Sequence, residues 1–182
     1  KVVLITGAAG SIGSGMVRQL ARYAPSQLVL LDQAESPLYD LHIELLKEFP
    51  AINFEVVIGD IRSLHRMNKL FSATRPEFVF HAAAYKHVPL MEDNPTEAVL
   101  TNVKGTRNLA DLSVEYGVQK FVMVSTDKAV NPTNVMGASK RAAEMILQAL
   151  QEECSTTKFA MVRFGNVLAS SGSVVPLFQD QI

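Results

Sequence analysis

The feature that most constrains the fold is a glycine-rich turn near the start of the chain. Val2–Thr6 is almost entirely apolar and is typical of a buried strand. Gly7, Gly10 and Gly13 follow at intervals of three residues, where an amphipathic pattern begins. Glycines at such a junction let the backbone turn tightly and let a phosphate approach the helix N-terminus, where free N–H groups bind anions. A purely structural turn is the alternative, but the position between a strand and a helix favours dinucleotide binding.

Short apolar runs alternate with longer amphipathic stretches along the whole chain, which is the pattern of βαβ units. The apolar runs are hydrophobic on both faces, as in parallel strands covered by helices on two sides. We therefore predict an α/β fold, a Rossmann-type doubly wound parallel sheet forming one domain over residues 1–182. The predicted strands are Val2–Thr6, Leu28–Leu31, Phe54–Ile58, Phe78–His81, Lys120–Ser125 and Phe159–Arg163. The predicted helices are Ser11–Tyr23, Pro37–Phe49, Leu64–Thr74, Pro95–Tyr116 and Val135–Glu153, with Glu144 and Glu153 at polar positions of the last.

The composition narrows the class of protein. Hydrophobic residues make up 48% of the 182 residues and the formal net charge is −1. These values fit a folded globular domain and give no electrostatic reason to expect nucleic acid as a partner. Cys154 is the only cysteine, so we expect neither disulfides nor a cysteine-based zinc site, and we expect a reducing, cytoplasmic setting. No metal is expected, because no cluster of His, Asp and Glu has metal-ligand spacing.

The two ends of the chain predict an excerpt of a longer protein. Lys1 leads directly into the first strand, and the last residues before Ile182 form no closing helix. No apolar run reaches the ~20 residues that a membrane helix needs. Contact with the inner face of a membrane is therefore expected only through a segment that is absent here.

Further residues support NAD as the cofactor. Asp32 ends the second predicted strand, where an acid binds the ribose hydroxyls of adenosine, and neither Gln33 nor Ala34 could meet the 2′-phosphate of NADP. Asp60 follows the third strand and could accept a hydrogen bond from the adenine amino group; its alternative is a place beside a helix cap. Small residues after the fourth strand leave room for a dinucleotide. The predicted cofactor-binding residues are Gly7, Ala9, Gly10, Ser11, Ile12, Gly13, Asp32, Asp60, Ile61, Ala82, Ala83 and Ala84.

Together, GxxGxxG, the acid after the second strand, HAAA at 81–84 and MGASK at 136–140 resemble the extended short-chain dehydrogenase/reductase superfamily. In that superfamily a Tyr-x-x-x-Lys pair on one helix face does the chemistry, and its lysine also binds the nicotinamide ribose. Lys140 stands in the lysine position, which implies both a catalytic and a cofactor-binding role. Met136 stands in the tyrosine position, and it cannot accept a proton because a thioether has no titratable group.

The segment STDKAVNP at 125–132 resembles the active-site loop of the nucleotide-sugar 4,6-dehydratases. Its Asp-Lys pair, together with AAAYKHVPLMEDNP, TNVKGT and RFGNVL, resembles the UDP-N-acetylglucosamine branch, some members of which carry methionine in the tyrosine position. The resemblance implies dehydration of UDP-N-acetylglucosamine, a UDP-sugar, to a 4-keto-6-deoxy product for bacterial surface polysaccharide or glycan biosynthesis. It also implies a C-terminal substrate lobe that is largely absent here, and a homodimer or higher homo-oligomer formed through Pro95–Tyr116 and Val135–Glu153.

The resemblance assigns roles to the residues of this loop. Thr126 would hydrogen-bond the sugar 4-hydroxyl, Lys128 would be the base at carbon 5, and Asp127 would be the acid for the 6-hydroxyl. Asp127 must then hold a proton until elimination, so we expect its pKa to be raised. The group that takes the 4-hydroxyl proton stays open between ionised Asp127 and a water relayed to Lys140. Without the flanking motifs, the Asp127–Lys128 pair would read as a solvated loop pair.

Three residues are predicted to contact substrate. Lys86 and His87 follow the fourth strand, at the carboxyl ends of the strands, and an exposed loop is their alternative. Asn166 follows the sixth strand and is expected to bind the substrate diphosphate. His42 and His65 are predicted on helix surfaces. Two other functions stay open: a nucleotide-sugar epimerase, which needs no acid–base pair for elimination, and a catalytically silent dinucleotide-binding protein.

Overall fold

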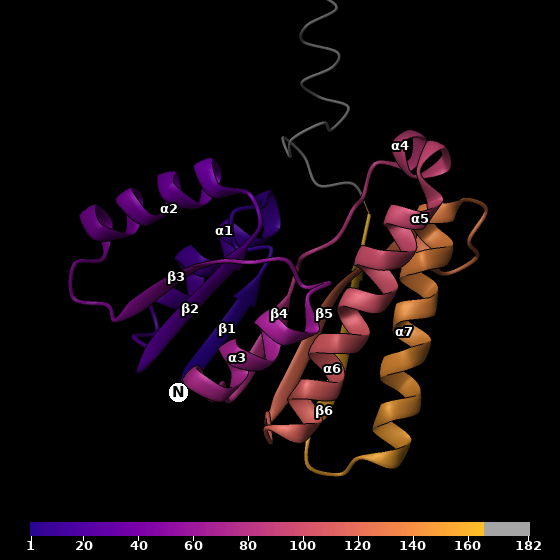
Figure 1. Ribbon diagram of the computed structural model, residues 1–182. Coiled ribbons are helices and arrows are strands. Elements are labelled where there is room, and N and C mark those ends of the chain that lie inside the picture. Colours follow the sequence, from indigo (N-terminus) through magenta and orange to yellow (C-terminus); the bar gives the residue numbers. More distant parts are fainter. Residues whose placement is uncertain (166–182) are drawn as a thin grey trace, which may run out of the picture.

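A computed structural model describes residues 1–165 and shows one parallel sheet of six strands in the order β3-β2-β1-β4-β5-β6 (Figure 1). The strands are β1 (Val2–Thr6), β2 (Gln27–Asp32), β3 (Phe54–Ile58), β4 (Phe78–His81), β5 (Lys120–Thr126) and β6 (Lys158–Phe164). The chain reverses its direction across the sheet between β1 and β4, which lie side by side. Such a topological switch point is where doubly wound sheets bind their ligands.

Helices cover both faces of the sheet. They are α1 (Ser11–Ala21), α2 (Glu35–Glu48), α3 (Leu64–Thr74), α4 (Val88–Asp93), α5 (Pro95–Ala98), η1 (Val99–Gly105), α6 (Thr106–Glu115), η2 (Asp127–Ala129) and α7 (Val135–Glu153). Alternate residues of β1 point to opposite faces, as the period of a strand requires. Val3 and Ile5 pack with α1 and α2, whereas Leu4 packs with α3, α6 and α7. The two hydrophobic cores therefore lie one on each face of the sheet.

All six predicted strands are confirmed, each within one residue at either end. The helices Leu64–Thr74 and Val135–Glu153 are confirmed to the residue, while the first helix ends earlier, at Ala21, and the second spans Glu35–Glu48. The short helix α4 was not predicted. Glu144, predicted at a polar position of α7, is fully buried, so that prediction was wrong.

The predicted helix Pro95–Tyr116 is interrupted by η1, a π-helical segment of seven residues between α5 and α6. It turns Thr101, Asn102 and Gly105 inward, and all three are buried. A Cβ on Gly105 would lie 2.6 Å from the side chain of Ile61, so this helix rests closely on the loop that follows β3. π-Helical turns are rare and are often found at functional sites.

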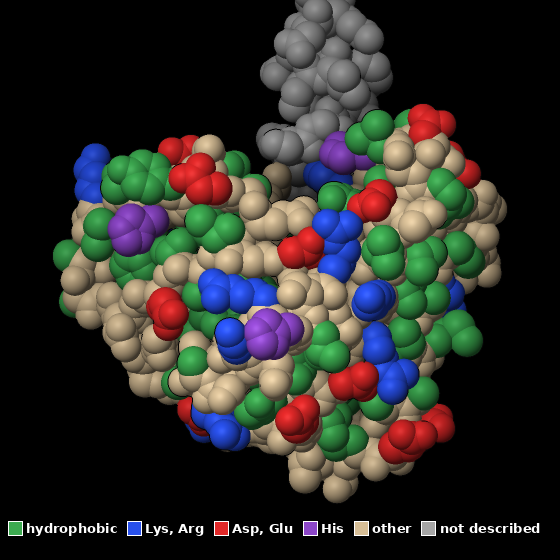
Figure 2. Space-filling view, in the orientation of Figure 1, with side chains coloured by type: hydrophobic (Ala, Val, Ile, Leu, Met, Phe, Trp, Pro, Cys, Tyr) green, Lys and Arg blue, Asp and Glu red, His purple; other side chains and the backbone are tan. Residues whose placement is uncertain are grey.

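The outer surface of these helices carries exposed hydrophobic side chains. Val99 on η1 is 50% exposed and Met145 on α7 is 56% exposed. Figure 2 shows hydrophobic side chains gathered over α6 and α7. Within residues 1–165, no helix has the length and apolarity needed to span a membrane.

Candidate functional site

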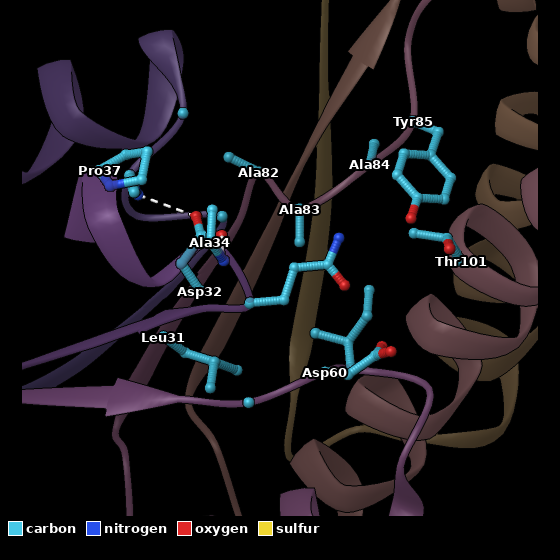
Figure 3. Close-up of a pocket in the computed structure, with 16 residues that line it drawn as sticks. Leu31, Asp32, Ala34, Pro37, Asp60, Ala82, Ala83, Ala84, Tyr85 and Thr101 are labelled. Atoms are coloured by element: carbon cyan, nitrogen blue, oxygen red, sulfur yellow. Dashed lines mark hydrogen bonds between the residues drawn. The ribbon is translucent and has the colours of Figure 1, made fainter. Parts of the chain in front are cut away.

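A cleft of about 220 Å³ opens at the carboxyl ends of β1 to β4 (Figure 3). Of the predicted cofactor-binding residues that do not line it, Ser11 and Ile12 begin α1, Gly13 is buried in α1, and Lys140 lies on α7. The predicted residues that do line it are Gly7, Ala9, Gly10, Asp32, Asp60, Ile61, Ala82, Ala83 and Ala84. The structure therefore brings together residues from four separate segments of the chain.

The glycines of the turn serve two different purposes. Gly7 has a φ of +69°, and a Cβ there would lie 2.5 Å from the backbone nitrogen of Ala83. A Cβ on Gly13 would lie 1.9 Å from the carbonyl oxygen of Gly7, so both glycines are required for the turn to pack. Gly10 is exposed at the start of α1, and a Cβ there would meet only the Gly7 oxygen, at 3.3 Å. The missing side chain of Gly10 leaves space at a helix N-terminus, which suits an anion such as a pyrophosphate.

Asp32 is held in place by the backbone of two loops. The amide of Ala9 donates to Oδ2 over 2.9 Å, and the amide of Ala34 donates to Oδ1 over 3.0 Å. A carboxylate can accept about four hydrogen bonds. Two accepting positions therefore stay open toward the cleft, which is the number that a ribose diol needs.

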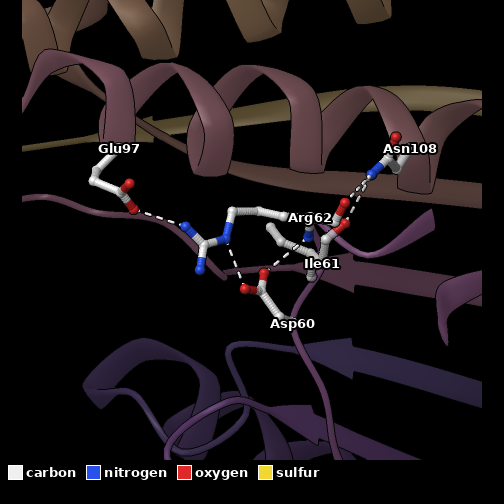
Figure 4. Close-up of polar contacts among 5 residues, drawn as sticks. All are labelled: Asp60, Ile61, Arg62, Glu97 and Asn108. Carbon is white, nitrogen blue, oxygen red and sulfur yellow. Dashed lines mark hydrogen bonds and ion pairs between the residues drawn. The ribbon is translucent and has the colours of Figure 1, made fainter. Parts of the chain in front are cut away.

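Asp60 belongs to a chain of ionic contacts (Figure 4). Its Oδ1 accepts from the amide of Arg62 over 2.8 Å, and its Oδ2 accepts from Arg62 Nε over 2.6 Å. Arg62 also donates to Glu97 on α5 over 2.7 Å, and Asn108 on α6 donates to the carbonyl of Ile61 over 3.0 Å. Ser63, not Asp60, caps α3. These contacts fix the loop after β3, with its acid at the edge of the cleft.

Two residues that line the cleft were missed by the sequence analysis. The Thr101 hydroxyl is buried and finds no hydrogen-bond partner among residues 1–165. A buried polar group without a partner costs free energy, so this hydroxyl is a natural contact for a ligand atom. Tyr85 points its side chain toward Thr101 (Figure 3), and Asn102 of η1 holds the Tyr85 backbone through two hydrogen bonds of 2.9 and 3.0 Å. The segment TNVKGT was noted only as a family signature, although its π-helical turn is what directs Thr101 inward.

The predicted catalytic loop lies at the end of β5. Thr126 Oγ1 donates to Asp127 Oδ1 over 2.9 Å, and Lys128 Nζ donates to the same oxygen over 3.3 Å. These contacts, that of Thr126 first, lower the pKa of Asp127, which is exposed. The prediction of a raised pKa is therefore wrong for this conformation, because the surroundings favour the charged carboxylate. A Cβ on Gly137 would lie 2.5 Å from the carbonyl oxygen of Lys128, so α7 packs directly against this loop.

Lys140 is buried behind the loop and donates from Nζ to the carbonyl of Val124 over 2.7 Å. Burial lowers the pKa of Lys140 to about 8, and the attraction of Glu144 opposes that fall. A lysine that titrates near neutral pH is typical of functional sites.

His81 closes the floor between the two clusters. Thr106 Oγ1 donates to the Asn102 carbonyl over 2.7 Å, so it accepts from His81 Nε2 over 2.9 Å. His81 Nδ1 therefore accepts from the Thr6 hydroxyl over 2.7 Å. Burial, and then the charge of Lys140, lower the pKa of His81 to about 3. His81 is thus a neutral link between β1, β4 and α6.

Met136 lies on α7 one helical turn before Lys140 and is 4% exposed. It packs with Met91 and Ala98, and the Tyr85 side chain lies against this cluster. The thioether therefore forms part of an apolar wall that joins α4 and α5 to α7.

The predicted substrate contacts are only partly described. Lys86 and His87 are exposed on the loop between β4 and α4, and Asn166 lies outside the described residues. Of the two histidines predicted on helix surfaces, His65 is exposed as expected. His42 is half-buried, with its ring 5.4 Å from that of Phe54, so its prediction was wrong.

Comparison with known proteins gives consistent matches over the full chain. The chain is 52% identical to the capsular polysaccharide biosynthesis protein CapD of Staphylococcus aureus, covering 100% of this chain and 31% of that protein. It is 38% identical to an inverting UDP-N-acetylglucosamine 4,6-dehydratase of Campylobacter jejuni, covering 100% of this chain and 54% of that enzyme. The chain thus spans about half or less of the length of these relatives.

Solved structures share the fold. The crystal structure of Pen from Bacillus thuringiensis matches with a TM-score of 0.88 and 38% identity, over 100% of this chain and 55% of that one. A DesIV double mutant, a dTDP-glucose 4,6-dehydratase of Streptomyces venezuelae with NAD bound, matches with a TM-score of 0.81 and 25% identity, over 98% of this chain and 61% of that one. These likenesses confirm the resemblance to the extended short-chain dehydrogenases/reductases. Residues 3–182 match the family described as polysaccharide biosynthesis protein, and the chain belongs to that family.

Proposed function

We propose that this chain forms the NAD-binding, catalytic part of an enzyme that dehydrates UDP-N-acetylglucosamine to the 4-keto-6-deoxy sugar nucleotide for polysaccharide biosynthesis. The observation that carries the proposal is the Asp127–Lys128 ion pair at the end of β5, packed against the helix that bears Lys140. An epimerase acting at carbon 4 has no use for such an acid–base pair. The named dehydratase from Campylobacter jejuni supports the choice of sugar nucleotide.

The residues of the cleft fit a dinucleotide. Asp32 has two accepting positions for the adenosine ribose, and Asp60 lies where the adenine edge would reach. Gly10 leaves space for the pyrophosphate, and Thr101 offers its unpaired hydroxyl. Lys140 would bind the nicotinamide ribose. When bound, NAD supplies the hydride acceptor and donor that the reaction needs, and the NAD in the DesIV structure supports this choice of cofactor.

The charged state of Asp127 suggests how the chain manages without a tyrosine at position 136. Since its pKa is lowered, Asp127 begins as a carboxylate and is able to accept the proton of the 4-hydroxyl. The protonated Asp127 is then the acid that delivers this proton to the departing 6-hydroxyl, which leaves as water. Lys128 removes the proton at carbon 5 in the same elimination. Asp127 thus gains the proton that the sequence analysis expected it to hold from the start.

The test is to incubate the full-length protein, without added cofactor, with UDP-N-acetylglucosamine and to follow the mass of the sugar nucleotide. We expect the loss of one water. An unchanged mass with an altered sugar configuration would assign the protein to the epimerases, and no change in the sugar would leave it a silent dinucleotide-binding protein.

A further inference from the structure

A buried carboxylate lies beneath the catalytic loop. Glu144 is fully buried on α7, one helical turn beyond Lys140. Ser125 Oγ donates to Glu144 Oε1 over 2.6 Å, and Arg163 Nε donates to the same oxygen over 2.9 Å. Arg163 Nη2 donates to the other oxygen, Oε2. The guanidinium thus holds the carboxylate with both arms, which is the strongest geometry for such a pair.

These contacts join three elements at one level of the sheet. Ser125 and Arg163 are paired across β5 and β6, and Glu144 reaches both from α7. Lys140 adds a second tie at this level through the carbonyl of Val124. The catalytic loop begins two residues after Ser125. A shift of α7 along β5 would therefore move the loop relative to Lys140.

Glu144 is also the counter-charge of Lys140. Burial favours the neutral carboxyl, but hydrogen bonds from Arg163 and Ser125 outweigh it and leave the pKa of Glu144 below its usual value. The carboxylate is therefore charged at neutral pH, and its attraction raises the pKa of Lys140 against the effect of burial.

Other groups around Lys140 do not take over this role. His81, at the end of β4, is neutral at physiological pH. The ion pair of η2, which packs on α7, contains one charge of each sign. Arg163 and Arg141 both contact Glu144, and so their charges reach Lys140 together with that of the carboxylate.

We propose that Glu144 is a positioning residue, which fixes α7 against the end of β5 and balances the positive charge of Lys140. The part of this proposal that concerns turnover rests on the proposed function. The part that concerns the charge of Lys140 does not, because it can be measured without substrate.

The first experiment titrates Lys140 directly by NMR, in full-length protein labelled with carbon-13 at the lysine Cε atoms. The Lys140 signal is assigned from its loss in Lys140→Arg. We expect Glu144→Gln, which keeps the shape of the side chain, to lower the pKa of Lys140 by about one unit, since a nearby negative charge is lost. Glu153→Gln, at an exposed position of the same helix, is the matched control and should leave that pKa unchanged. An unchanged Lys140 pKa in folded Glu144→Gln would overturn the electrostatic role.

The second experiment separates position from charge. Ser125→Ala keeps the carboxylate and its arginine but removes the hydroxyl that ties them to β5. We expect the pKa of Lys140 to stay within a few tenths of a unit while turnover falls about tenfold, as misplacement of catalytic groups predicts. Wild-type turnover in Ser125→Ala would overturn the positioning role, and this variant keeps the test valid if Glu144→Gln does not fold. If the wild-type protein itself turns over no sugar nucleotide, the proposed function fails while the NMR titration still decides the charge balance.

Discussion

At the scale of single residues, Asp127 is the group on which the proposed reaction depends most. Replacing it by Asn keeps the shape but removes both the base for the 4-hydroxyl and the acid for the 6-hydroxyl. We expect the rate of water loss to fall by about 10²- to 10⁴-fold, the usual contribution of general acid–base catalysis. The rate is measured by mass spectrometry of the sugar nucleotide, with bound NAD quantified in parallel and expected to be unchanged.

A suitable control for this variant is Asp111→Asn. Asp111 is an exposed acid on α6 that pairs with Arg107, far along the chain from the loop. It should retain wild-type turnover. Full activity in Asp127→Asn would show that another group carries the proton from the 4-hydroxyl.

The buried amine of Lys140 predicts a pH-dependent stability. Its pKa is lowered from 10.5 to about 8 in the folded protein, so between these values the unfolded chain keeps a proton that the folded protein has lost. The free energy of unfolding must therefore rise with pH across this window, by about 3 kcal/mol from this group alone. Urea unfolding at pH 7 and pH 10.5 should show this gain in the wild type and its absence in Lys140→Met.

The comparison for this prediction is Lys47→Met, because Lys47 is exposed on α2. That variant should show the same pH dependence as the wild type. If Lys140→Met also keeps the full rise, the buried amine does not titrate in this range.

Sequence motifs located some site residues and could not reveal others. Gly7 and Asp32 were predicted because their roles depend on a local turn and on the end of one strand. Thr101 and Glu144 were missed because their burial depends on how distant elements pack. The spacing of Lys140 and Glu144, four residues apart on one helix face, was the available signal that both side chains point inward.

At the scale of elements, the contact between α7 and η2 sets the position of the catalytic loop. Gly137→Ala would place a Cβ 2.5 Å from the backbone oxygen of Lys128, so the loop must move. We expect turnover to fall by about 100-fold in a protein that still folds and binds NAD, since small displacements of reacting groups have such effects. Steady-state kinetics and NAD content provide the measurement.

Gly15→Ala is the matched control in α1, where a Cβ would meet nothing within 4 Å. It should leave turnover unchanged and raise the free energy of unfolding by about 0.5–1 kcal/mol, because alanine favours helix. Equal effects of the two substitutions on turnover would argue against a specific role for the α7–η2 contact.

Element types followed from the hydrophobic pattern, while interruptions did not. The strands were recognisable because residues such as Val29 and Leu30 are apolar on both faces. The π-helical turn at Val99–Gly105 leaves the apolar pattern of Pro95–Tyr116 nearly unchanged, and so it was invisible. α4 was missed because six residues are too few to establish a period.

At the scale of the whole molecule, the exposed hydrophobic side chains on η1 and α7 fit the predicted homo-oligomer. Met145, 56% exposed, lies on the outer face of α7. Met145→Arg would place a charge in such an interface and should shift the protein toward monomer in light scattering at micromolar concentration. Arg at an exposed polar position, in Gln148→Arg on the same helix, tests whether added charge alone has this effect. A wild-type protein that is already monomeric would contradict the predicted assembly.

The π-helical segment also determines which changes in chain length the protein can accept. An α-helix advances about 100° per residue, so deleting one residue from Val99–Gly105 would rotate everything after it by that amount. Thr106 would then leave His81, and Asn108 would leave the loop after β3. Substitutions along this helix are therefore far more tolerable than gaps, and natural variation in length should collect in the turns between elements instead.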